Sequence, residues 1–196
     1  MFKDHMMDWL TNSIGEAKLD HRFMAQPHRI GTRNFDSGIS HYSQWSGKGH
    51  RDLEHHIIPV IAGADGSQPG VMKAMRALMD FIYIAQYPLQ SDMTLDALKL
   101  ALSNFHKNKE IFIQNGSRTG SAGVIDHMNI PKVHALHQWM TNIPDLGTTN
   151  NYCTEIGETL HIEYIEQIIR YLIRLESLHL YRGYLRGQWY KSPASI

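Results

Sequence analysis

Apolar residues recur along the chain at helical spacing. The clearest stretch covers residues 92 to 115, and its repeating apolar residues are Leu95, Leu98, Leu102, Phe105 and Phe112. Steps of three, four, three and seven residues separate them, which places them on one face of a helix. Ser91 or Asp92 can cap the start of this helix, and Gly116 can end it.

Two earlier stretches also predict helices. Residues 70 to 87 are apolar around most of a helix circumference, so we expect a central, largely buried helix that ends before Pro88. Residues 48 to 62 place one apolar face toward a core, with Ser46 as the N-cap.

The remaining pattern sets the fold class. We expect two short helices in the first 25 residues, one helix that begins at Pro131, and a last one from Thr154 to beyond Tyr171. Glycine-bearing loops are expected at 26–47 and 117–129, the second being the more flexible. No run of strand-like alternation occurs. We therefore predict an all-α, irregular multi-helix domain of about six to seven helices over residues 1–182, and a loose tail over 183–196.

Composition narrows the function classes. The 196 residues contain 19 basic and 19 acidic side chains, so there is no overall attraction to nucleic acid or membrane. Cys153 is the single cysteine, which excludes an intramolecular disulfide framework and suits a reducing, intracellular compartment. The first ten residues mix acids with apolar residues, so we expect no signal peptide, and charges interrupt every long apolar run, so we expect no membrane span.

The segment "TEIGETLHIEY", residues 154–164, concentrates acids at a helix start. At about 100° per residue, Glu158 shares the apolar stripe that continues through Ile162, Ile165 and Ile169, and His161 lies on the same side. Two interpretations stay open. Glu155 and Glu158 can be first-turn acids favoured by the helix dipole, with Thr154 as N-cap. They can also be one corner of an active site.

Other candidate sites are weaker. His134 and His137 share a helix face and could flank a metal or a carboxylate, although no third ligand is evident. Glu-x-x-His occurs twice, in "ETLH" and "ESLH", but both copies fall on what we predict to be one helix, which argues against a di-iron bundle. No phosphate-binding glycine loop and no G-x-S-x-G elbow is present.

Several longer stretches resemble one family, the Plavaka-type transposases of fungal genomes. They are "HRFMAQPHRIGTRNFDSGISHYSQWSGKGHRDLEHHIIPVIAGA", "RALMDFIYIAQYPLQSDMTLDALKLALSNFHKNKEIF", "NIPKVHALHQW" and "TEIGETLHIEY", in the family's order. The resemblance covers roughly residues 1 to 165 and is specific because it is long and collinear. Such proteins are similar to cut-and-paste DDE transposases, whose RNase H-like core holds two divalent metals on three carboxylates.

The resemblance implies a fragment without the RNase H-like sheet. The two catalytic aspartates of the family would belong to an upstream core that this chain lacks. The last catalytic and metal-binding acid would be Glu155 or Glu158, supported by His134 and His161. Mg²⁺ or Mn²⁺ is implied for the intact family only, so the isolated chain is expected to carry no cofactor and to be inactive. Weak, non-specific DNA binding and a nuclear location are also implied.

The chain departs from the family's pattern in three places. Beyond Tyr164 the resemblance ends; Gln138 stands where a second histidine is expected; and Gly49 stands where an acid is usual. These differences suggest a decayed or truncated copy. A function of another class is a small helical interaction module without chemistry, which would use the aromatic tail residues Tyr181, Tyr184, Trp189 and Tyr190.

Overall fold

The structure is a computed structural model that describes residues 2–42, 45–151, 164–165 and 167–169. The chain divides into two units, Met1–Asn151 and Tyr152–Ile196, and each is described by itself. The fold is all-α, as predicted: apart from helices, the described residues form only a two-stranded hairpin.

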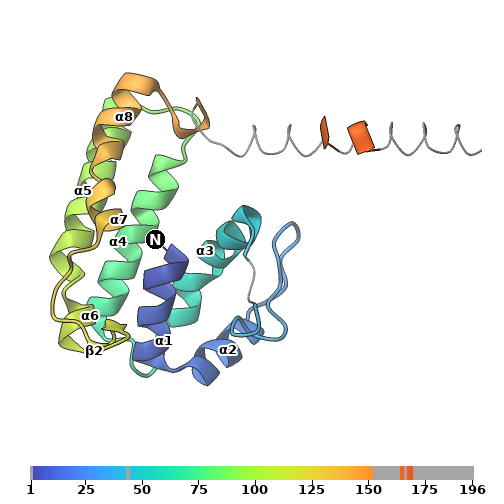
Figure 1. Cartoon of the computed structure of the whole chain (residues 1–196), viewed down its shortest axis with the longest axis vertical. Coiled ribbons are helices and arrows are strands. Elements are labelled where there is room, and N and C mark those ends of the chain that lie inside the picture. Colours follow the sequence, from blue (N-terminus) through green and yellow to red (C-terminus); the bar gives the residue numbers. More distant parts are fainter. Residues whose placement is uncertain (1, 43–44, 152–163, 166, 170–196) are drawn as a thin grey trace, which may run out of the picture. The chain divides into compact units, whose positions relative to one another are not determined.

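Helices make up most of the first unit (Figure 1). A π-helix, Phe2–Met7, leads into the first α-helix. The α-helices are α1 (Asp8–Ile14), α2 (Glu16–Met24), α3 (Gly47–Ile61), α4 (Pro69–Ala85), α5 (Asp92–Asn108), α6 (Ile111–Gln114), α7 (Pro131–Ala135) and α8 (Gln138–Leu146). The strands β1 (Thr119–Gly120) and β2 (Gly123–Val124) pair antiparallel, and a 3₁₀ turn covers Thr149–Asn151.

The core is built around α4, which packs along α5 and also contacts α3 and α6. Figure 1 shows α4 and α5 running side by side, with α8 beside α5. This position agrees with the apolar circumference seen in the sequence. However, α3 and α4 each bury eight residues, so α4 is central because of its neighbours and not because it is the more buried helix.

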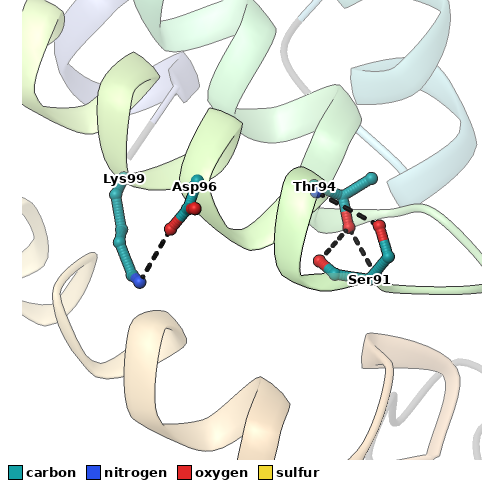
Figure 2. Close-up of polar contacts among 4 residues, drawn as sticks. All are labelled: Ser91, Thr94, Asp96 and Lys99. Carbon is teal, nitrogen blue, oxygen red and sulfur yellow. Dashed lines mark hydrogen bonds and ion pairs between the residues drawn. The ribbon is translucent and has the colours of Figure 1, made fainter.

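The predicted caps at Ser91 and Ser46 are confirmed. The Ser91 hydroxyl accepts a hydrogen bond from the backbone N–H of Thr94, and the Thr94 hydroxyl accepts one from the Ser91 N–H (Figure 2). This reciprocal box satisfies two N–H groups that the first turn would leave unpaired. Figure 2 also shows the ion pair of Lys99 with Asp96, 3.1 Å apart on the same helix. Ser46 accepts from the Gly49 N–H at the start of α3.

The single helix predicted over residues 92–115 is wrong. It breaks after Asn108 into α5 and α6, because the short α6 turns Phe112 onto the Trp9 ring, with 4.9 Å between ring centroids. Ile111 meanwhile packs against Gly70 of α4, where an added Cβ would lie 2.9 Å from Ile111 Cγ1. Tertiary contacts therefore outweigh the continuous helical pattern.

The two predicted loops are irregular but structured. In the described part of 26–47, the buried Phe35 contacts the rings of Phe23, Tyr42, Trp45 and His56. The segment 117–129 contains the β1–β2 hairpin, and Ser117 and Arg118 at its base are buried.

Only residues 164–165 and 167–169 of the second unit are described, and they are helical. Their large apolar side chains are exposed: Tyr164 by 70%, Ile165 by 43%, Ile168 by 47% and Ile169 by 49%. The predicted tail, 183–196, lies outside the described residues. Among the helices that are described, none has the length and apolarity needed to cross a membrane.

Candidate functional site

Three of the four site residues predicted from the sequence, Glu155, Glu158 and His161, lie outside the described residues. Their assignment therefore stays a prediction. The fourth, His134, is exposed on α7. Ile165 and Ile169 were predicted to share one apolar stripe with Glu158. Both side chains are exposed, so the stripe is not buried at these two positions.

The structure brings His134 and His137 near a third histidine that the sequence did not single out. The His106 ring, on α5, stacks on the His137 ring with 4.9 Å between centroids. Burial lowers the pKa of His106 to about 4, helped by positive charge from Lys109, His137 and His134. Its Nε2 is buried without a hydrogen-bond partner. A neutral imidazole therefore fills this contact between α5 and the α7–α8 segment.

This trio is not a metal centre. Within the part of the chain that the structure describes, no group of three or more His, Cys, Asp or Glu side chains converges well enough to hold a metal ion. The spacing of His134 and His137 suggested a metal site, but the described residues provide no third ligand for one.

A cavity of about 600 Å³ is the more substantial site. It lies where α1 meets the hairpin and the start of α7. Its polar lining comprises His5, Asp8, Thr11, Asn12, Arg118, Thr119, Asn129 and Lys132, and its apolar lining comprises Trp9, Ile125, Ile130 and Pro131. Its volume is within the range of small-molecule sites.

Arg118 is the most unusual residue in this lining. It is only 6% exposed, although arginine is rarely so buried without an ion pair. Its Nε donates to the backbone carbonyl of His127, and its guanidinium carbon lies 5.5 Å from the centre of the Trp9 ring. Burial lowers the pKa of Arg118, and the negative charge of Glu110 acts in the opposite direction.

The backbone around Arg118 is fixed by hydrogen bonds. Its N–H donates to the Phe112 carbonyl at 2.8 Å, and its carbonyl accepts from the Ile125 N–H at 2.9 Å. Asn12 of α1 donates to the Ser117 carbonyl at 2.8 Å and to the Thr119 hydroxyl at 2.9 Å. The two bonds from Asn12 join segments about a hundred residues apart, and the four bonds together hold the backbone of Arg118 at the cavity wall.

Sequence reasoning missed Arg118. Its surroundings, "NGSRTGSAG", are small and polar, which is typical of a solvent-exposed loop. An arginine among small polar residues gives no signal of burial, since its contacts come from Trp9 of α1 and from the His127 carbonyl.

A second group of buried ionisable residues lies on α3. Asp52, Glu54 and His56 are 5%, 9% and 1% exposed. Burial raises the pKa of Glu54 to about 7, against an opposing effect of Arg51. Burial also lowers the pKa of His56, whose two ring nitrogens have no hydrogen-bond partner. Beside them, the His55 ring stacks on Tyr83 of α4 with 5.6 Å between centroids.

Comparisons of the chain with protein-family models, with curated proteins and with solved structures found no match. The geometry and the sequence therefore carry the functional argument.

Proposed function

We propose that this chain is the helical, C-terminal portion of a DDE transposase-like protein, which contacts DNA but does not cleave it alone. The observation that carries this proposal is the collinear resemblance of residues 1 to 165 to Plavaka-type transposases. The all-α fold is compatible with a region that follows an RNase H-like core.

In the intact relative, Glu155 or Glu158 would be the last of three carboxylates that hold two Mg²⁺ or Mn²⁺ ions. Those ions would activate water or a 3′-hydroxyl for attack on a phosphodiester. The upstream core would supply the other two acids, and the protein would act on DNA in the nucleus. His134 and His161 would support the acid from neighbouring positions.

Binding of duplex DNA by the isolated chain is expected to be weak, independent of sequence and strongly dependent on salt. Residues 165–196 contain five basic residues, Arg170, Arg174, Arg182, Arg186 and Lys191, against Glu166 and Glu176, an excess of three positive charges. Neutralising about three phosphates should lower affinity about 40-fold between 50 and 200 mM salt. Fluorescence anisotropy with two unrelated duplexes at several salt concentrations measures this.

A cleavage assay with Mg²⁺ or Mn²⁺ completes the test, and no strand cleavage is expected from this chain. Tight, salt-insensitive or sequence-selective binding would contradict the proposal, as would cleavage by the chain alone. A further check is the coding sequence before Met1, which should encode a strand-rich segment with two aspartates.

The exposed side chains of the second unit favour a second candidate function, a protein-interaction module. Tyr164, Ile165, Ile168 and Ile169 are all at least 43% exposed, and apolar groups clustered on one short segment are typical of interfaces. If they mediate self-association, Ile168→Glu should shift a concentration-dependent dimer to monomer in analytical ultracentrifugation. An unchanged sedimentation profile from low to high concentration would remove this candidate.

A further inference from the structure

We propose that the cavity around Arg118 binds a phosphate group. This site lies apart from the predicted catalytic acids and does not depend on the transposase-like function. Four features of the described residues carry the inference: a buried guanidinium, the absence of a close counter-charge, a polar rim and an apolar wall.

The buried charge of Arg118 is costly in the absence of a partner. Arg118 stays cationic at neutral pH, and removing a cation from water is unfavourable unless a counter-charge compensates. Among the residues that the structure describes, no carboxylate lies within 4 Å of its nitrogens; Glu110 attracts it from farther away, and the Trp9 ring provides a weaker contact. An anion in the cavity would supply the missing partner.

The geometry of the Arg118 side chain also suits an anion. A guanidinium has five N–H donors, and the bond to the His127 carbonyl uses the one on Nε. The two terminal nitrogens form the planar fork that binds carboxylate and phosphate oxygens in pairs. Because the backbone and Nε of Arg118 are already fixed, little side-chain freedom would be lost when an anion binds.

The rest of the wall fits a phosphate that carries an organic group. Thr119 and Asn129 bring a hydroxyl and an amide group to the rim. The Asn12 amide already donates to the Ser117 carbonyl and the Thr119 hydroxyl, and it holds this hydroxyl in place. Trp9, Ile125 and Ile130 form an apolar side that a sugar or base could contact. Asp8 also lines the cavity, but it is exposed, whereas Arg118 is buried. Water and salt therefore screen the negative charge of Asp8 more strongly than the positive charge of Arg118.

Phosphate can reach the site from two sources, as a free small anion or as part of a nucleic acid strand. Both present the same tetrahedral oxygens to Arg118. Isothermal titration with inorganic phosphate, with a thymidine dinucleotide whose one phosphate is the internucleotide diester, and with thymidine, which has no phosphate, distinguishes them. Sodium chloride at matched ionic strength controls for general screening.

Two variants and one control test the residues. Arg118→Met removes the fork while keeping a long apolar side chain. Asn129→Asp places a negative charge on the rim with almost no change in size and leaves Arg118 intact. Gln138→Glu makes the same amide-to-acid change on α8, at an exposed position that does not line the cavity. Thermal unfolding without ligand reports whether each variant folds.

We expect the unmodified chain to bind a phosphate ligand, Asn129→Asp to weaken that binding at least about tenfold, and Gln138→Glu to leave it within about twofold. Arg118→Met should abolish it; if this variant fails to fold, the comparison of Asn129→Asp with Gln138→Glu decides. Binding of inorganic phosphate indicates the free anion as source, and binding of the dinucleotide without binding of inorganic phosphate or thymidine indicates a strand. No binding of either, or equal binding by all folded variants, overturns the proposal.

Discussion

Replacing Leu98 by alanine is expected to lower the free energy of unfolding by about 3 to 5 kcal/mol. Leu98 is 0% exposed and lies on α5, the helix that packs along α4 at the centre of the core. The substitution removes three buried carbons and leaves a cavity, while alanine keeps the helix propensity high. Because small domains are stable by only about 5 to 15 kcal/mol, the change should be plain in urea unfolding followed by circular dichroism.

Leu100→Ala is the matched control for this experiment. It is the same substitution on the same helix, two residues away, but Leu100 is 60% exposed. Its cost should stay within about 0.5 kcal/mol, since little contact is lost. If both variants lose equal stability, or if Leu98→Ala unfolds like the unmodified chain, the described packing of α5 on α4 is wrong.

Much of this packing follows from the sequence. The apolar repeat of α5 predicted its buried face, because Leu98, Leu102 and Phe105 are all buried at helical spacing. The caps at Ser46 and Ser91 were also predictable, because a hydroxyl just before an apolar period satisfies N–H groups of the first turn. These features depend on neighbours within a few residues.

What could not be predicted depends on distant residues. The break between α5 and α6 follows from the contact of Phe112 with Trp9, more than a hundred residues earlier in the chain. The burial of Arg118 has the same origin, since Asn12 and Trp9 of α1 cover a segment that looks like an exposed loop. The stacking of His106 on His137 likewise requires α5 and the start of α8 to be adjacent.

The helix count shows the same limit. About six to seven helices were expected, whereas α1 to α8 are present in the described ranges. The difference arises where a continuous apolar pattern is interrupted by a turn, once between α5 and α6 and once between α7 and α8. Helical periodicity indicates which face is buried, but it does not show where tertiary contacts redirect the chain.

Stability is expected to fall by about 3 kcal/mol between pH 4.5 and pH 8 because of Glu54 alone. Burial on α3 raises the pKa of this carboxyl from its usual 4.5 to about 7, which means that the folded state binds its proton more tightly than the unfolded state. In this interval the folded state holds more protons, so the free energy of unfolding decreases as pH rises. At 1.36 kcal/mol per pKa unit, the difference between 4.5 and about 7 corresponds to about 3 kcal/mol, and the loss is complete about one pH unit above 7.

Glu54→Gln isolates this effect, because glutamine keeps the shape of the neutral acid and does not titrate. The stability gap between the variant and the unmodified chain should grow by about 3 kcal/mol from pH 4.5 to pH 8, in favour of glutamine. Other buried groups titrate in the same range, His106 among them, but they are common to both proteins and cancel in the difference. Glu16→Gln, at an exposed position of α2, is the control for the same acid-to-amide change away from the buried face of α3. Chemical unfolding at closely spaced pH values measures both gaps. A gap for Glu54→Gln that is flat with pH would show that this carboxylate is well solvated or paired in the folded protein, and that its burial on α3 is wrong.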